Sequence, residues 1–304
     1  MGIEVIDENN MALCAIVIAG IQLLGFIVAA LFKLNNLVHC SSGLGLTVVA
    51  LLTFFLSQTY APRQIVITVF VAVWGARQIV VTLMTMIPKT NENECCERNS
   101  RYLLLLFWSW FSQIGYVFAL SLVVIFTNSV KYSSDEFGAW EIVGTVIACL
   151  GLLIEILADA QVFFFKKNPE NKEKFCDAGV WKWSRHPTLF GDIVLFWGIF
   201  VMNCGVLSGG DWTAVFSPAA ITMSIIFGWV TGYEQCHDRL YGELESYRAY
   251  KYQTSPLIPF PPFLYKILPT FAKFLFFCEF PCYNKLDSSG QTKTDVPTEK
   301  SEIV

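Results

Sequence analysis

The chain has 304 residues and a formal net charge of −4 at pH 7; 54% of its residues are hydrophobic and only 15% are charged. A soluble domain carries about 25% charged residues, so this apolar excess excludes a soluble enzyme and a disordered module. The sequence has no basic domain and no interleaved basic and aromatic stripe, which excludes nucleic acid as a partner. The composition predicts an all-α, polytopic helical membrane protein.

Apolar segments predict about seven membrane-spanning helices when the sequence is read in windows of about 19 residues. The segments are 12–33, 44–57, 64–87, 101–127, 138–165, 188–207 and 213–231. The first begins among acidic residues rather than basic ones, so we expect it to be retained and not cleaved as a signal peptide. The second has only 14 residues, which is short for a membrane core about 30 Å thick. We expect it either to re-enter the membrane from one side or to extend into the turn at Ser41–Gly43.

The distribution of basic residues predicts the orientation of these helices. Eighteen of the 21 Lys and Arg residues fall on one side of the membrane, and Arg63 and Lys131 fall on the other. Because cytosolic loops are enriched in positive charge, the C-terminus is predicted to be cytosolic and the N-terminus to lie on the opposite side. The stretch 283–304 is polar and has no aromatic residue after Tyr283, so it is predicted to be a disordered cytosolic tail.

Ten cysteines are spread over the chain without a C-x-x-C pair, and four of them lie in or beside apolar segments. A disulfide framework and a metal site are therefore not expected. The adjacent Cys95 and Cys96 lie in a polar loop and are expected to be reduced thiols.

Ionisable side chains in or at the ends of the predicted spans are candidates for function, because a charge there costs about 2.5–3.5 kcal/mol. They are Arg77, Glu141, Glu155, Asp159, Asp192 and Glu234. Glu155 and Asp159 are four residues apart, which places them on one face of a helix. One interpretation is an ion pair between helices, for example Arg77 with Asp159. The other is a polar cavity, lined by Arg77, Glu155 and Asp159, that holds a charged ligand.

The stretch 163–192, between the fifth and sixth predicted spans, concentrates side chains that suit an anion. It reads FFFKKNPENKEKFCDAGVWKWSRHPTLFGD and contains six cations, two tryptophans and the only His-Pro pair. Pro187 suits the first turn of the next helix, whose N-terminal N–H groups lie beside Arg185. This predicts an anion-binding loop. The alternative is a basic cytosolic loop with tryptophans at the membrane interface.

Within this stretch, G-V-W-K-W-S-R-H-P-T-L-F-G-D at 179–192 resembles the G-x-W-x-x-x-R-H-P-N-Y-x-G-[DE] signature of membrane reductases with a steroid 5-alpha-reductase-like C-terminal domain. The resemblance continues in F-K-K-N-P at 165–169, in Tyr247 and Tyr250, and in T-S-P-L-I-P-F-P-P at 254–262. It covers about residues 140–262 and, more weakly, the W-G-x-R sequence that ends at Arg77.

The resemblance implies an NADPH-dependent reductase of the endoplasmic reticulum membrane, which transfers a hydride to an activated carbon–carbon double bond of a steroid, sterol or enoyl lipid. By position, the residues that would bind the cofactor in a cytosolic loop region are Lys166, Trp181, Arg185, His186, Thr188, Leu189, Cys236 and Tyr247. It also implies the domain organisation: substrate-side helices at 1–137, the reductase-like domain at 138–262, an interfacial segment at 263–282 and the tail at 283–304. It identifies no catalytic residue and no protein partner.

Two other functions remain open because the sequence departs from the signature. Thr188 and Leu189 stand where the signature has Asn-Tyr, and Gly232 stands where sterol reductases have an aspartate. One alternative is a non-catalytic relative that binds lipid or acts as a scaffold. The other is a methyltransferase of the isoprenylcysteine carboxyl type, which has a similar R-H-P loop but binds S-adenosylmethionine. The six cations favour a phosphorylated cofactor.

Overall fold

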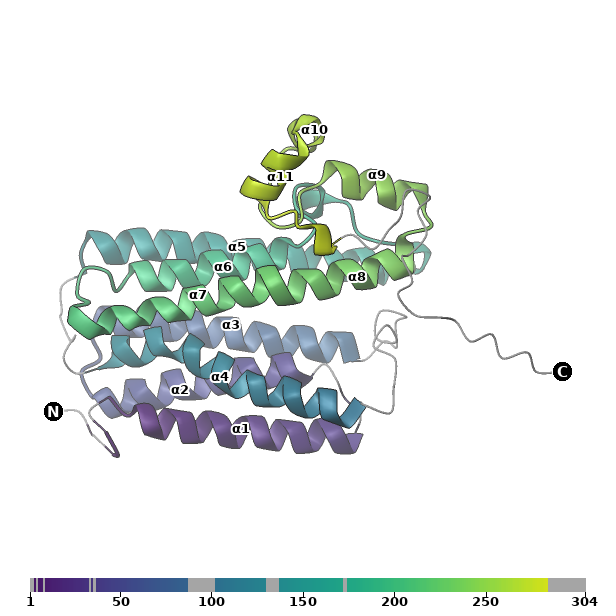
Figure 1. The fold of residues 1–304 in the computed structure, drawn as a ribbon. Coiled ribbons are helices and arrows are strands. Elements are labelled where there is room, and N and C mark those ends of the chain that lie inside the picture. The colour runs from purple at the N-terminus through teal and green to yellow at the C-terminus, as the bar shows by residue number, and fades with distance from the viewer. Residues whose placement is uncertain are drawn as a thin grey trace. The chain divides into compact units, whose positions relative to one another are not determined.

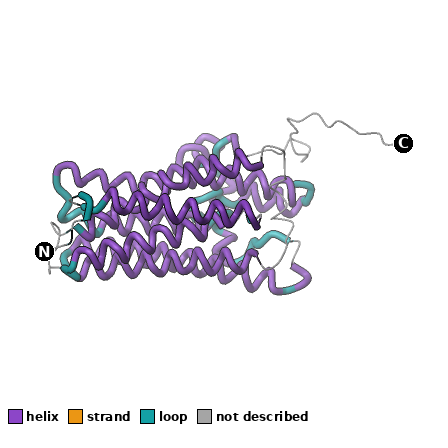
Figure 2. The backbone as a smooth tube through the Cα atoms, turned by 90° about the horizontal axis from the view of Figure 1, so that it is seen from below, coloured by secondary structure: helices purple, strands orange, loops and turns teal. Residues whose placement is uncertain are grey.

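The computed structural model describes residues 3, 5–7, 9–32, 34, 37–86, 102–129, 137–171 and 174–283. Helices form the regular structure of this part of the chain, apart from one isolated parallel bridge between Ser184 and Ser255 (Figure 2). The predicted all-α class is therefore confirmed. The Cys95–Cys96 pair and the predicted tail after residue 283 lie outside the described residues.

The chain divides into two compact units, which we describe separately. Unit 1 consists of Met1–Asp159 and Thr188–Ser224, and unit 2 consists of Ala160–Pro187 and Ile225–Val304. Each unit thus combines two separate stretches of the chain. The four domains proposed from the sequence follow the extent of the family resemblance, and their boundaries stay a prediction.

Unit 1 contains most of the helices that are long and apolar enough to cross a membrane. They are α1 (Met11–Phe32), α2 (Leu37–Ser57), α3 (Pro62–Met86), α4 (Tyr102–Asn128), and α5 (Ala139–Lys167), whose last turns belong to unit 2. A sixth candidate span, Gly209–Tyr241, includes η5 (Gly209–Val215), α7 (Phe216–Ser224), the π-helical turn η6 (Ile225–Trp229) and α8 (Val230–Tyr241). The shorter α6 (Pro187–Val201) is also apolar. The protein is a polytopic helical membrane protein.

Three of the predicted spans have different lengths in the structure, and the last of them, 213–231, lies within the longer candidate span Gly209–Tyr241. The short segment 44–57 is the end of α2, which begins at Leu37 and has 21 residues; of the two alternatives, extension into Ser41–Gly43 is confirmed, although these residues are helical and form no turn. The segment 188–207 instead forms only the 15-residue α6 and a turn. Asn203 is fixed after this helix, where its Nδ2 donates to the carbonyl of Ile199 and its Oδ1 accepts from the hydroxyl of Thr127. These polar contacts end the helix although the sequence remains apolar.

The helices of unit 1 pack closely where small residues face one another. Among the first four helices, α2 packs against α1, α3 and α4, and these helices run side by side in Figure 1. Between α5 and α6, a methyl group added at Gly191 would lie 2.8 Å from the carbonyl oxygen of Gly151 and 2.5 Å from Cγ of Glu155. Glycine permits such close approach of helices in membranes. This close approach brings Glu155 of α5 directly against Gly191 of α6.

Unit 2 is built from short helices and connecting segments. It contains η3 (Pro169–Asn171), η4 (Gly179–Lys182), α8, α9 (Glu245–Gln253), α10 (Pro262–Ile267), α11 (Thr270–Phe277) and η7 (Pro281–Tyr283). Tyr283 is only 1% exposed, and its hydroxyl donates to the carbonyl of Ile226 at 2.6 Å. The predicted disordered tail therefore cannot begin at this residue, because Tyr283 is fixed in the core of unit 2.

Candidate functional site

The G-x-W-x-x-x-R-H-P stretch of unit 2 starts at a turn that only glycine fits well. Gly179 has φ of +60°, and a Cβ atom there would lie 2.4 Å from the side-chain amide of Gln161. The oxygen of that amide accepts a hydrogen bond from the backbone N–H of Val180 at 2.9 Å. The last turns of α5 thus hold the beginning of η4, which carries Trp181 and Lys182.

We expect Gly179→Ala to destabilise this turn by about 1–2 kcal/mol from backbone strain, with a further loss from the clash with Gln161. Thermal denaturation in detergent should show a lower midpoint than for the wild type. Gly232→Ala is the matched control in the same unit, because a Cβ atom at Gly232 meets no atom within 4 Å. Equal midpoints for the two variants would contradict this role of Gly179.

Arg185 is buried in unit 2 and is held from several sides. It is 4% exposed, and its backbone N–H donates to the carbonyl of Ser255 at 2.9 Å. Its guanidinium group donates to the carbonyl of Lys251 at 3.1 Å and forms ion pairs with Glu234 at 3.3 Å and Glu279 at 3.4 Å. Burial opposes the charge, but these two carboxylates outweigh it, so the pKa of Arg185 is raised. Arg185 is a charged, fully engaged residue of the interior.

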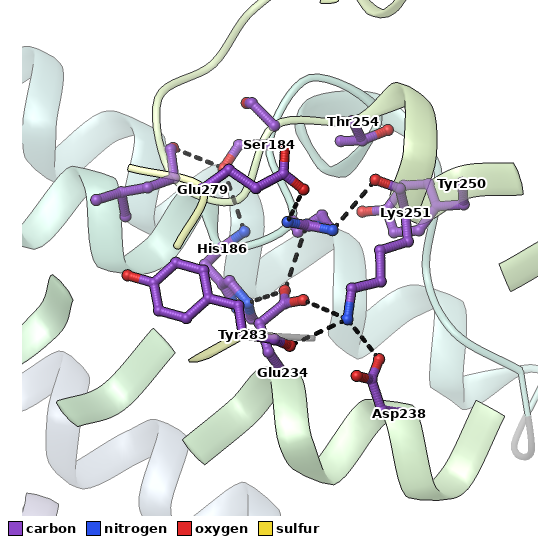
Figure 3. Close-up of polar contacts among 12 residues, drawn as sticks. Ser184, His186, Glu234, Asp238, Tyr250, Lys251, Thr254, Glu279 and Tyr283 are labelled. Atoms are coloured by element: carbon purple, nitrogen blue, oxygen red, sulfur yellow. Dashed lines mark hydrogen bonds and ion pairs between the residues drawn. The ribbon is translucent and has the colours of Figure 1, made fainter. Parts of the chain in front are cut away.

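Glu234 of α8 is the centre of this charged network (Figure 3). Its Oε1 lies 2.8 Å from Nε2 of His186, and its Oε2 lies 3.1 Å from Nζ of Lys251. Lys251 also donates to Oδ1 of Asp238 at 2.6 Å, one helical turn after Glu234. The spacing of four residues places both acids on one face of α8. One helix face therefore receives the R-H-P segment and the lysine of α9.

The T-S-P-L-I-P segment closes directly on the R-H-P segment. The hydroxyl of Ser184 donates to the carbonyl of Leu257 at 2.7 Å and accepts from the backbone N–H of His186 at 3.1 Å. The backbone N–H of Phe260 donates to the carbonyl of Trp183 at 2.9 Å. Two motifs about seventy residues apart thus form one continuous hydrogen-bonded structure.

Aromatic side chains complete the core of unit 2. The hydroxyl of Tyr250 donates to the carbonyl of Trp181 at 2.7 Å, and that of Tyr247 donates to Asp238 at 3.2 Å. The ring of Phe175 lies within 6 Å of both tyrosine rings. Burial raises the pKa of Tyr247, and the nearby carboxylates raise it further. Both tyrosines of the predicted Y-x-x-Y pair are therefore neutral hydrogen-bond donors that fix the fold.

The C-terminal segment supplies partners that the sequence did not reveal. Glu279, which follows α11, pairs with Arg185 and accepts a hydrogen bond from the hydroxyl of Tyr265. Burial raises the pKa of Tyr265, as does the carboxylate of Glu279. The carbonyl of Tyr283 accepts from Nζ of Lys251 at 3.2 Å. The segment predicted to lie at the membrane interface therefore contributes to the charged core of unit 2.

The structure divides the residues expected to bind the cofactor into three groups. Arg185, His186 and Tyr247 are buried together around Glu234 and Asp238. Lys166, Trp181 and Cys236 are half-buried in the same unit, and Nζ of Lys166 lies 3.3 Å from the hydroxyl of Tyr241. Thr188 and Leu189 are half-buried residues of unit 1.

Charge balance tests whether these residues fit a dinucleotide phosphate. In the buried network, the carboxylates of Glu234, Asp238 and Glu279 match or exceed the charges of Arg185 and Lys251, with His186 as a further partner. A phosphate group requires an excess of positive charge, so the buried part of the motif does not fit as its direct ligand in this arrangement. The exposed Lys182 and the half-buried Lys166 and Trp181 do fit, since they offer cations and an indole ring.

The acidic residues predicted for a cavity lie in a second network, within unit 1. Nε of Arg77 lies 2.6 Å from Oδ2 of Asp159, and Nη1 lies 2.6 Å from Oε2 of Glu155. The interpretation as an ion pair between helices is therefore confirmed for Arg77 with Asp159, whereas a polar cavity for a charged ligand stays a prediction. Asp192 of α6 joins it, because its Oδ1 accepts from the indole N–H of Trp74 at 2.7 Å and lies 3.6 Å from Arg77. The W-G-x-R sequence of α3 thus supplies two polar groups that contact the final acid of the signature.

Comparisons with known proteins give the family but no activity. No curated protein and no solved structure matches the chain. Residues 25–254, which include both charged networks apart from Glu279 and the contacts after it, match one family over most of the chain. The chain belongs to the family described as "Protein of unknown function (DUF1295)".

Proposed function

We propose that this protein is an NADPH-dependent membrane reductase that acts on an activated carbon–carbon double bond of a lipid. The observation that supports this most is the closure of three distant parts of the reductase-like signature on one another in unit 2. The R-H-P, Y-x-x-Y and T-S-P segments share direct hydrogen bonds, and Glu234 of α8, outside the signature, joins them through ion pairs with Arg185 and His186. If the spacing resembled the signature only by chance, its separate segments would have no reason to contact one another in the fold.

The proposed cofactor site uses the accessible residues of this structure and not its buried core. Lys166 and Lys182 would pair with phosphate oxygens, and Trp181 would stack on a ring of the dinucleotide. When bound, the reduced nicotinamide supplies the hydride. Arg185, His186 and Tyr247 are positioning residues, because they hold η4 and the adjoining segment against α8 and α9. Their proposed role therefore changes from binding the cofactor to positioning the residues that bind it.

The substrate is proposed to be a lipid because unit 1 consists of apolar membrane-spanning helices. Side chains of α1 such as Ile16, Leu24 and Leu31 are more than 60% exposed, as expected of a surface that faces acyl chains. The basic residues on one side of the spans favour a cytosolic position for the cofactor site. The endoplasmic reticulum is the membrane that the family resemblance suggests.

A titration of the purified protein in detergent with three cofactors tests the proposal. We expect NADPH to bind more tightly than NADH, because lysines pair with the additional 2′-phosphate, and we expect this difference to shrink with salt. S-adenosylmethionine should not compete. Binding of S-adenosylmethionine alone would favour a methyltransferase. If no cofactor binds to well-folded protein, a non-catalytic lipid-binding or scaffold role replaces the proposal.

Substitution of the accessible lysines tests the position of the site. Lys166→Gln and Lys182→Gln should each lower the affinity for NADPH about 5- to 30-fold, the effect of one charge-assisted contact of about 1–2 kcal/mol. Their thermal midpoints should stay close to that of the wild type. Lys266→Gln is the matched control, since Lys266 is exposed on α10 of the same unit and outside the signature. Unchanged affinity in both variants would place the cofactor elsewhere.

A further inference from the structure

Unit 1 contains two buried groups of charged side chains that differ in charge balance. In the first, Arg63 of α3 and Glu141 of α5 form a pair with one charge of each sign at 3.0 Å. In the second, Arg77 meets Glu155 and Asp159 of α5 and Asp192 of α6. Among the described residues, Arg77 is the one basic side chain that contacts these three acids. With every group ionised, the second group would carry a net charge of −2.

A net charge of this size is unfavourable within membrane-spanning helices. Even a single ionised carboxylate is unfavourable in a helix at the bilayer centre, and a buried charge without a partner is more so. Asp159 is the most accessible of the three acids, with 24% of its side chain exposed, whereas Glu155 is fully buried. The charge that is hardest to maintain is therefore the one on Glu155 or on its immediate neighbour.

Glu155 also has an oxygen atom that no donor reaches. Its Oε2 accepts from Arg77, but its Oε1 is buried and has no hydrogen-bond partner in the structure. The neighbouring carboxyl group is that of Asp192, because Nη1 of Arg77 lies 2.6 Å from Oε2 of Glu155 and 3.6 Å from Oδ1 of Asp192. The contact is close because Gly191 and Gly151 let α6 approach α5. Two carboxyl groups can form a hydrogen bond only if one of them carries a proton.

We infer that Glu155 and Asp192 hold one proton between them, so that unit 1 has an intramembrane proton-binding site. The groups that face this site are Arg77 and Trp74 from α3, Asp159 from α5, and Tyr116 from α4, which interacts with Asp192. A bound proton reduces the net charge of the group to −1 and gives the free oxygen of Glu155 a partner. Asp159 remains ionised at the accessible side of Arg77.

A proton fits this geometry better than a metal ion. In the described part of the chain, no group of three or more His, Cys, Asp or Glu side chains converges as metal ligands do. Arg77 lies among the three carboxylates and separates Asp159 from the pair. A shared proton needs only the two facing carboxyl groups. The inference does not depend on the proposed function, since it requires neither cofactor nor substrate.

Infrared spectroscopy of the purified protein, without any cofactor, tests the site. At about pH 8, exposed carboxyl groups are ionised, because their ordinary pKa is about 4. We expect the wild-type protein to show the C=O stretch of a protonated carboxylic acid and a shift of that band in D2O. Glu155→Gln or Asp192→Asn should remove the band. Its absence from the wild-type spectrum would overturn the inference, and so would its persistence in both variants.

Glu141→Gln is the matched control, because Glu141 is as buried as the proposed site but has an arginine of its own. This variant should keep the band. It should also lose thermal stability, since it discards a balanced ion pair, whereas Glu155→Gln should keep a midpoint near that of the wild type because glutamine imitates the protonated acid. If Glu141→Gln removes the band instead, the proton belongs to another pair and the inference is wrong.

Discussion

Replacing Glu234 with alanine is expected to destabilise unit 2 by about 3–5 kcal/mol, because the change removes the carboxylate that three buried side chains share. Arg185, His186 and Lys251 all lie within 3.3 Å of its carboxylate. Lys251 keeps Asp238 and Arg185 keeps Glu279, but His186 loses the carboxylate beside its ring and Arg185 loses one of its two ion pairs. A denaturant titration in detergent, followed by tryptophan fluorescence, would measure the loss.

Two further variants identify the origin of this effect. Glu243→Ala removes an exposed acid just after α8 and should change the stability by less than about 0.5 kcal/mol. Glu234→Gln keeps the shape of the side chain and one hydrogen-bond acceptor, so it should retain part of the stability. A folded Glu234→Ala protein of wild-type stability would show that the charged network does not hold unit 2 together. For the same reason, Arg185→Ala is expected to unfold this unit and not only to weaken cofactor binding.

Replacing Arg77 with alanine should have a comparable effect in unit 1, a loss of about 3–5 kcal/mol. The change removes the one described cation beside Glu155, Asp159 and Asp192 and leaves an acidic group inside the membrane-spanning helices. The measurement is the denaturant midpoint of the purified protein, or the fraction that elutes as a single species after mild heating.

Removing one acid should rescue this variant in part. Asp159→Asn in the Arg77→Ala background lowers the excess negative charge, so the double variant should be more stable than Arg77→Ala alone. Arg77→Lys should fall between the wild type and Arg77→Ala, because lysine keeps the charge but cannot hold two carboxylates in a fixed planar arrangement. If the double variant shows the full sum of two independent losses, the residues are not coupled.

Hydropathy predicted the helices well where a span is apolar throughout its length. The predicted limits of the first, third and fifth spans differ from α1, α3 and α5 by at most two residues at either end. It missed the first seven residues of α2, which include His39, Ser41 and Ser42. The two serines have partners on other helices: the hydroxyl of Ser41 donates to Gln22 of α1, and Ser42 accepts from Gln113 of α4. Hydropathy averaged over a short window of sequence cannot detect hydrogen-bond partners that lie on other helices.

The sequence predicted which residues form the candidate site better than it predicted what those residues do. The spacing of the signature identified Arg185, His186 and Tyr247, and the structure places them together. Their interpretation as cofactor ligands assumed that no carboxylate of the protein already pairs with their positive charges. Glu279, which pairs with Arg185 from 94 residues away, carries no motif that could have indicated this contact. Only the Glu234–Asp238 spacing on one helix face could have suggested that the cations were already paired.

The contact between Arg185 and Glu279 also determines how late in synthesis unit 2 can complete its fold. A ribosome synthesises Arg185 long before Glu279, so the R-H-P segment emerges while this partner is still missing. The spans of unit 1 up to α5 can enter the membrane by then, whereas the core of unit 2 can close only after translation has passed residue 283. Before that point, Arg185 lacks its ion pair with Glu279, and Lys251 lacks its hydrogen bond to the carbonyl of Tyr283. Quality control during biogenesis will therefore depend on the final turns of this unit, and a fusion placed before them would leave its core unfinished.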